Sequence, residues 1–288
     1  MFVKTRLQSG FIITLFILES SALSPLMRIS LWLKLAITGV MIAAGTLSLQ
    51  AAPVDSKAKY VVSLAGVNVA SVEIHFKDDG KQYQIDLGAN ISGVGTLIAS
   101  GKAFADTNGK TSIGGLAPGE FGINTRANGQ NMAVAVQFAS GDATGFQVDP
   151  PILNNINRIA LERKHLRGVA DPIGSFILKG KELAANLCDR RLKVFTGLER
   201  FDIEMSYVDT QNATSTRTAY QGPVVLCRLR YVPISGHFTT SEMTAYLSNS
   251  DRILIWYAPL GTSEYFIPYR VLIGTSAGDL SMVLTGLN

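Results

Sequence analysis

The chain has 288 residues, of which 47% are hydrophobic, and it carries 26 basic and 22 acidic side chains. Its surplus of positive charge is concentrated in residues 1–51, where one acidic and four basic residues occur: Glu19, Lys4, Arg6, Arg28 and Lys34. Residues 52–288 then carry 22 − 21 = +1. The net charge of residues 52–288 therefore does not predict a nucleic-acid partner. These residues are numerous enough to form one domain with a large core.

The N-terminus has the pattern of an export signal. A short basic stretch, residues 27–34, precedes the apolar run 35–47, and Leu49-Gln50-Ala51 supplies the small-residue ending that a signal peptidase prefers. The apolar run is shorter than the roughly 20 residues of a membrane-spanning helix. We therefore expect cleavage after Ala51, a periplasmic protein and no stable transmembrane anchor, with a retained signal anchor as the alternative.

Two further expectations concern this region. Met27 is an alternative start codon, so that residues 1–26 would be a misassigned start. The domain organisation that we predict is a signal segment over residues 1–51, followed by a single β-rich domain over residues 52–288.

Residues 60–91 predict two successive hairpins. Strands are expected at 60–64, 67–76 and 83–91, and Asp79-Gly80 is a strong turn because both residues tolerate positive φ. Within 67–76 the alternation of apolar residues slips by one position, which predicts a β-bulge near Ala70. Residues 92–100 fit either a short helix or a crossing loop.

The next segment continues the series of strands. Hairpin turns are expected at Asn108-Gly109 and Asn128-Gly129, with strands at 121–125, 132–138 and 145–148. Asp149-Pro150-Pro151 ends the series, because proline cannot donate a hydrogen bond to a sheet.

A helical segment is expected between residues 151 and 185. Asp171 reads as an N-cap and Pro172 as the first helical residue, and the helix would extend to Leu178. Its apolar residues Ile173, Phe176 and Ile177 recur at helical spacing. We expect this helix to plug one side of a curved sheet.

The only two cysteines, Cys188 and Cys227, bracket strands predicted at 192–195, 201–208, 217–220 and 224–232. If residues 209–215 form a hairpin tip, Cys227 lies opposite Gly197, so a bridge would not be a simple cross-strand pair. In an oxidising compartment we expect a disulfide that ties the helical segment, or the start of the meander, to the last strand. Closing a loop of about 39 residues should contribute roughly 4 kcal/mol. Free buried thiols are the alternative.

The remaining strands are expected at 244–247, 253–257, 269–273 and 280–284. Five aromatic residues gather there and are interpreted as core: Trp256, Tyr257, Tyr265, Phe266 and Tyr269. The predicted fold class is mainly β, a curved antiparallel sheet or incomplete barrel that clasps one or two short helices.

No familiar catalytic constellation is found. Ser276 lies in a Gly-x-Ser-x-Gly pattern, but the pattern should be followed by a helix and a histidine, whereas ten residues remain and none is His. The three histidines, His75, His165 and His237, lack partners at metal-ligand spacing. The basic run 163–167 is interpreted as a solvated loop. Arg200, Asp202 and Glu204 are interpreted as an exposed polar face. We predict no catalytic, cofactor-binding or metal-binding residues and no cofactor.

Several segments together resemble the domain-of-unknown-function 3108 family of exported Gram-negative envelope proteins. The residues that carry the resemblance lie at 60–76, 91–94, 116–118, 171–172, 188–201, 222–223 and 227–233, and at Trp256 and Pro259. The family has no established activity, so the resemblance implies a location and a fold. The implied fold is similar to the curved half-barrel of periplasmic lipoprotein carriers, and from that analogy comes the hypothesis of a hydrophobic concavity that binds a lipid or acyl chain.

Three functions follow as hypotheses. The first is a non-enzymatic periplasmic module of the cell envelope that binds a lipid or hydrophobic small molecule in its concave sheet. The second is a protein-interaction or structural module with a filled core and an envelope protein as partner. The third is a hydrolase, which would need to bring together residues such as Ser276 and His237.

Overall fold

The computed structural model describes residues 53–288 except 94 and 96–100. The chain divides into two units, Met1–Leu49 and Gln50–Asn288, and the fold described below belongs to the second. The predicted signal, its cleavage site, the alternative start and most of segment 92–100 lie outside the described residues. In the part of the chain that is described, no helix is both long and apolar enough to span a bilayer.

One antiparallel sheet contains all the strands of the described chain. Its strands follow the order β7-β6-β5-β4-β3-β2-β1-β14-β13-β12-β11-β10-β9, and β8 pairs with β13. The first half consists of β1 (Val54–Leu64), β2 (Val67–Asp78), β3 (Gln82–Ile91), β4 (Gly101–Ser112), β5 (Gly115–Ala127), β6 (Gln130–Ala139) and β7 (Asp142–Asp149). The second half consists of β8 (Leu178–Lys179), β9 (Arg191–Phe195), β10 (Arg200–Ala213), β11 (Gly222–Ser235), β12 (Ile253–Pro259), β13 (Tyr265–Thr275) and β14 (Gly278–Leu287).

Most of the predicted turns and the bulge are confirmed. Gly80, Asn128 and Gly129 all have positive φ, as their hairpins require. The register between β1 and β2 shifts where Val62 pairs with Ala70 and Ser63 with Asn68. The prediction of a hairpin turn at Asn108-Gly109 was wrong. Both residues lie inside β4, at the point where its register with β5 shifts, and the chain turns only after Ser112.

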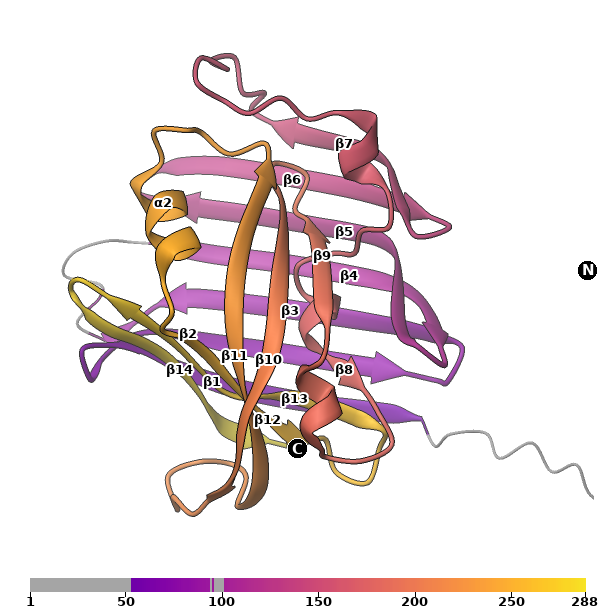
Figure 1. Ribbon diagram of the computed structural model, residues 1–288, viewed down its shortest axis with the longest axis vertical. Coiled ribbons are helices and arrows are strands. Elements are labelled where there is room, and N and C mark those ends of the chain that lie inside the picture. Colours follow the sequence, from indigo (N-terminus) through magenta and orange to yellow (C-terminus); the bar gives the residue numbers. More distant parts are fainter. Residues whose placement is uncertain (1–52, 94, 96–100) are drawn as a thin grey trace, which may run out of the picture. The chain divides into compact units, whose positions relative to one another are not determined.

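The two edges of the sheet approach each other and give a nearly closed barrel. Residues 168–170 bridge β7 and β9: the amide of Val169 donates to the carbonyl of Gly141 in the β6–β7 turn, and the amide of Ala170 to that of Lys193 in β9. Figure 1 shows β9, β10 and β11 crossing the direction of β3 to β7. We call this bridged gap between β7 and β9 the seam.

The core lies between strands of the two halves. Buried residues form three clusters, and one of them joins Tyr60, Ile85 and Leu284 to Tyr265 and Tyr269. The prediction that the aromatic residues of the C-terminal part are core is confirmed for Tyr257, Tyr265, Phe266 and Tyr269, each at most 8% exposed, whereas Trp256 is half-buried.

The predicted helical content was partly wrong. Asp171 does cap a turn, since its Oδ1 accepts from the amides of Ile173 and Gly174, but only a short 3₁₀ helix, Gly174–Phe176, follows. The expected strand 244–247 is instead the helix α2 (Glu242–Asn249), because Ser241 caps it through the amide of Thr244. The predicted fold class, a curved antiparallel sheet or incomplete barrel with short helices, is confirmed.

The predicted disulfide is present. Cys188 ends the 3₁₀ helix Ala185–Cys188 and is bonded to Cys227 in β11, with the Cα atoms 5.4 Å apart. The disulfide therefore ties the end of the segment between β7 and β9 to strand β11. The prediction of a strand at 217–220 was wrong. Strands β10 and β11 are longer than expected, and residues 214–221 form the connection between them. Cys227 lies opposite Tyr207 and not Gly197.

Candidate functional site

Ser276, His237 and His75 lie on different strands or connections of the sheet. Ser276 lies in the β13–β14 turn, which packs beside Ala65 in the β1–β2 turn. His237 lies after β11, and its carbonyl accepts from the amide of Ile159. His75 contacts Asp55, with 2.6 Å between Nε2 and Oδ1. Among the described residues no three His, Cys, Asp or Glu side chains gather as metal ligands would.

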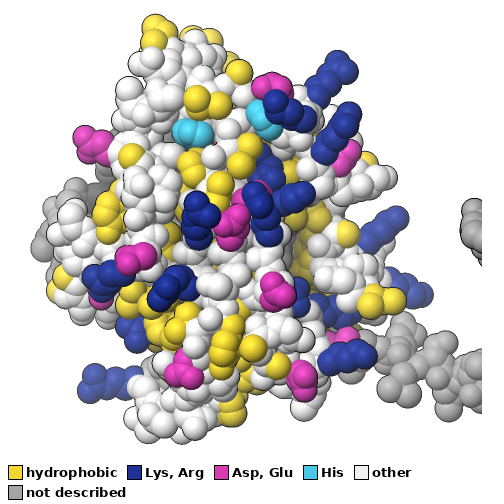
Figure 2. All heavy atoms as spheres, in the orientation of Figure 1, with side chains coloured by type: hydrophobic (Ala, Val, Ile, Leu, Met, Phe, Trp, Pro, Cys, Tyr) yellow, Lys and Arg dark blue, Asp and Glu magenta, His cyan; other side chains and the backbone are white. Residues whose placement is uncertain are grey.

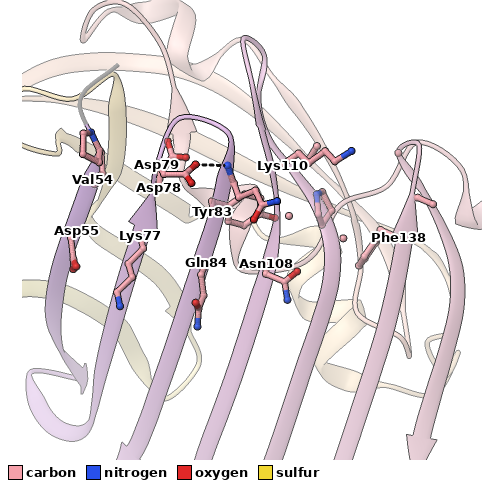
Figure 3. Close-up of a pocket in the computed structure, with 18 of the residues that line it drawn as sticks. Val54, Asp55, Lys77, Asp78, Asp79, Tyr83, Gln84, Asn108, Lys110 and Phe138 are labelled. Atoms are coloured by element: carbon pink, nitrogen blue, oxygen red, sulfur yellow. Dashed lines mark hydrogen bonds between the residues drawn. The ribbon is translucent and has the colours of Figure 1, made fainter. Parts of the chain in front are cut away.

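A broad cleft lies at the rim of the first half of the sheet, with a volume of about 1230 Å³ (Figure 3). It is lined by the start of β1, the β2–β3 turn, the irregular part of β4 and β5, and the β6–β7 turn. Charged and amide side chains dominate its labelled lining, among them Asp79, Gln84 and Lys110. We call this hollow the rim cleft.

The carboxylates of the rim cleft already serve the fold. Asp79 Oδ1 accepts from the amides of Gln82 and Lys81, both at 2.8 Å, and these two hydrogen bonds hold the pKa of Asp79 below its usual value. Asp78 accepts from the hydroxyls of Thr111 and Tyr265, at 2.5 and 2.7 Å. Both acids therefore fix the turn and anchor it to β4 and β13.

An acidic residue is buried inside the barrel. Asp171 is 0% exposed, its Oδ1 caps the following turn, and the buried hydroxyl of Tyr83 lies near its carboxylate. Burial raises the pKa of Asp171, although the amides of Gly174 and Ile173 oppose the shift. Burial also raises the pKa of Tyr83. A carboxyl in this environment favours its neutral form.

A second hollow, of about 550 Å³, lies at the seam. We call it the seam pocket and the segment that covers it, residues 150–161, the crossing loop. Two polar residues line it, Asn155 and Arg158. The rest of its lining is apolar or glycine: Phe146, Val148, Pro151, Ile152, Ile159, Ala160, Leu161, Gly197, Leu198 and Gly236. An apolar pocket of this size lies within the usual range for small-molecule sites.

Arg158 holds the crossing loop over the pocket. Its Nε donates to the carbonyl of Gly236 at 2.6 Å and its Nη2 to that of Leu198 at 2.7 Å. Its Nη1 donates to Asn155 Oδ1 at 3.3 Å, within the loop itself. The guanidinium is thus engaged with protein acceptors on both sides, and the apolar groups are what the pocket presents.

Two glycines allow the backbone segments around the pocket to approach closely. Gly197 has φ +85°, and a Cβ built there would lie 2.3 Å from Cγ1 of Val134. At Gly236, with φ +83°, a Cβ would lie 2.1 Å from the carbonyl oxygen of Leu198. Any side chain at these positions would force the β9–β10 turn away from β6 or from the end of β11.

The interpretation of Arg200, Asp202 and Glu204 as an exposed polar face was wrong. Arg200 and Asp202 are 6% and 3% exposed, and they form an ion pair with each other. Arg191 Nη2 lies 2.6 Å from Asp202 Oδ2 and extends the network toward solvent. Sequence spacing correctly placed the three side chains on one face of β10, but it could not reveal what covers that face.

The seam pocket was not predicted from the sequence. Its parts come from β7, the crossing loop, the β9–β10 turn and the end of β11, which are far apart along the chain. The sequence held one local sign of an unusual loop. The apolar residues Leu153 and Ile156 lie among asparagines before Arg158, in a stretch without strand or helix periodicity. The interpretation of residues 163–167 as solvated agrees with the exposure of Arg163, Lys164 and Arg167.

Comparisons with known proteins identify a family. The model of a family described as "Protein of unknown function (DUF3108)" matches residues 59–285, which is most of the chain. Among solved structures, the chain is similar to a beta-barrel-like protein of domain of unknown function DUF1849 from Brucella abortus. That likeness has 10% sequence identity and a TM-score of 0.48, and it covers 82% of this chain and 97% of the other. No curated protein matches the chain.

Proposed function

The chain belongs to the DUF3108 family, and we propose that it is an exported, non-enzymatic module of the cell envelope that holds a lipophilic group in its seam pocket. The observation that carries the proposal is the apolar lining of that pocket, in which Arg158 is already engaged with the carbonyls of Gly236 and Leu198. Such a site offers burial to an apolar group.

The concave face of the sheet is a weaker place for such a ligand. Inward-facing side chains of both halves meet there, including Tyr60, Ile85, Tyr265 and Leu284, each at most 2% exposed. A ligand would have to displace part of this packed core, whereas the seam pocket is open in the structure. We therefore place the lipophilic ligand at the seam.

Export to the periplasm is the second part of the proposal. The disulfide between Cys188 and Cys227 supports it, because such bonds form and persist mainly in oxidising compartments. The signal pattern of residues 27–51 supports it independently.

The ligand is tested with protein recovered from cells that express the full chain. Organic extraction and mass spectrometry should identify a bound lipid, and palmitate should displace the fluorescent probe N-phenyl-1-naphthylamine. Ala160→Trp introduces a large side chain at an exposed position that lines the pocket, and we expect it to lower probe affinity about tenfold or more. Ala127→Trp, at an exposed position in the β5–β6 hairpin, is the matched control. Equal binding by both variants, or no extracted lipid and no displacement, would reject the ligand.

A protein-interaction module is the second candidate, and the filled interior favours it. It predicts a stable envelope protein on crosslinking and no probe binding at the seam.

A further inference from the structure

The outer surface of the crossing loop carries an unusual combination of side chains. Leu153 is 89% exposed and Ile156 is 75% exposed, and Phe146 in β7 nearby is 46% exposed. Exposed apolar residues are ordinary when they are scattered, but two large ones within four residues of one loop form a protruding apolar tip. We call Leu153 and Ile156 the apolar tip.

The loop holds this tip in place through its own polar groups. Asn154 Oδ1 accepts from the amide of Ile156 at 3.1 Å, and the carbonyl of Asn155 accepts from the amide of Arg158 at 3.1 Å. Arg158 then anchors the loop to the carbonyls of Gly236 and Leu198. The tip is therefore presented outward by an ordered turn, and little conformational entropy is lost when it binds a surface.

Positive charge follows the tip along the chain. Residues 151–168 contain four basic residues and one acidic residue: Arg158, Arg163, Lys164, Arg167 and Glu162. Their net charge of 4 − 1 = +3 exceeds the +1 of residues 52–288, so the rest of that domain carries −2. Glu162 pairs with Lys164 at 2.9 Å, and in the described part of the chain neither Arg163 nor Arg167 has an ion-pair partner. Figure 2 shows basic side chains gathered at the upper right, where Figure 1 places a short helix in the later part of the segment between β7 and β8.

We infer that the crossing loop docks the domain on an anionic lipid bilayer, with Leu153 and Ile156 inserted among the acyl chains and Arg163 and Arg167 at the lipid phosphates. Apolar side chains flanked by basic ones are the features of a segment that lies in a membrane interface. Each basic side chain near an anionic membrane surface contributes about 1 kcal/mol, which corresponds to about fivefold in affinity. Because the same loop covers the seam pocket, docking would place the pocket of the proposed function next to lipid.

Vesicle flotation tests the docking with protein recovered from cells that express the full chain. Vesicles of phosphatidylcholine alone are compared with vesicles that contain phosphatidylglycerol, at low and at high salt. Wild-type protein should float with the anionic vesicles, more strongly at low salt. Leu153→Ser combined with Ile156→Ser should reduce the bound fraction about tenfold or more. Ile113→Ser, at a fully exposed position in the β4–β5 turn, should not change it.

Charge reversal separates the two contributions. Arg163→Glu with Arg167→Glu should remove the preference for phosphatidylglycerol, whereas Arg217→Glu, at an exposed position in the β10–β11 connection, should leave most of it. Because all variants are compared in the same processed form, any contribution from residues before 53 is common to them.

Three results would overturn the inference: no binding of wild-type protein to anionic vesicles, equal binding by the tip variant, or crosslinks from a photoreactive residue at position 153 to a protein instead of lipid. The tip variant should still bind N-phenyl-1-naphthylamine, since Leu153 and Ile156 are not among the residues that line the pocket. Loss of docking with retained probe binding therefore differs from failure of the proposed ligand.

Discussion

The second half of the sheet and the seam are held together in different ways. In the second half, Cys188 is covalently bonded to Cys227, and Arg200 and Asp202 form a buried ion pair. At the seam, residues 168–170 and the side chain of Arg158 provide hydrogen bonds, and Phe195 of β9 packs in one buried cluster with Val134 and Val136 of β6. A covalent bond and a buried charge pair cannot be opened at low free energy, whereas the hydrogen bonds that hold the crossing loop contribute about 1 kcal/mol each.

This difference indicates where the domain can change its shape. Local opening proceeds through the parts of a protein with the fewest buried contacts and the most exposed hydrogen bonds. The crossing loop fits that description, and the apolar pocket lies directly beneath it. A rigid side therefore supports a seam that can admit a ligand, and each prediction below tests one side of this contrast.

The largest expected effect is the loss of the buried ion pair. Asp202→Ala leaves the guanidinium of Arg200, whose side chain is 7% exposed, without its carboxylate. Removing one partner of a buried pair costs about 3 to 5 kcal/mol of unfolding free energy. Urea denaturation measures it. Arg230→Ala, which breaks an ion pair whose arginine is 71% exposed, is the control and should change stability by less than about 0.5 kcal/mol. Equal effects would mean that the network is solvated.

The next largest effect is that of the disulfide. Cys188→Ser with Cys227→Ser opens a covalent loop with a sequence separation of 39 and should lower the unfolding free energy by about 2 to 4 kcal/mol. A chemical reductant should lower the melting temperature of the wild-type protein and leave that of the double variant unchanged. An identical melting temperature for both proteins in non-reducing buffer would show that the second half of the sheet does not need its covalent bond.

The regular strands of the sheet and the seam also differ in how far the sequence predicts them. Hairpin strands follow from alternation, and the bulge near Ala70 follows from a slip in that alternation, because both are local. The pairing of Cys188 with Cys227 follows from their number and the inferred compartment. The seam depends on contacts such as those of Arg158 with Gly236 and Leu198, which lie 78 and 40 residues away. No local pattern encodes such contacts.

The errors have the same origin. Asn108-Gly109 has the composition of a hairpin turn, but the sheet register places it in a bulge against Ala117 and Pro118. The polar residues of β10 alternate as an exposed face would, yet tertiary packing buries Arg200 and Asp202. Residues 242–249 form a helix because Ser241 caps it, a signal that the apolar residues 246 and 247 obscured. In each case a local preference was overridden, or read without its context.

At the seam, Arg158→Ala should lower the unfolding free energy less than the loss of the ion pair or the disulfide does, but it should have a strong local effect. It leaves the carbonyls of Gly236 and Leu198 without the donor groups of Arg158, and we expect a loss of about 2 kcal/mol. Hydrogen exchange should quicken at residues 155–160 and 197–198 and remain unchanged at Cys227. Arg158→Lys should restore only part of the protection, because one ammonium group cannot reproduce the fork of the guanidinium. Arg163→Ala, at an exposed position, is the control. Faster exchange throughout the sheet would contradict a locally opening seam.

The smallest effect concerns Asp171, which follows the bridging residues 168–170. Burial raises its pKa above the ordinary value of 3.8, so between 3.8 and the raised pKa the native state binds more protons than the unfolded state. Asp171 therefore lowers the unfolding free energy as the pH rises from its unfolded pKa to its folded pKa. Above the folded pKa this destabilisation is complete. Asp171→Asn keeps an oxygen for the amides of Ile173 and Gly174 and removes the charge. The stability of the variant minus that of the wild type should thus be smallest near pH 3 and grow toward neutral pH, by on the order of 1 kcal/mol, while Asp251→Asn at the surface should give a flat difference. A difference that shrinks with rising pH would mean that hydrogen bonds to the ionised carboxylate outweigh its burial, and that the seam is held by charge as the second half of the sheet is.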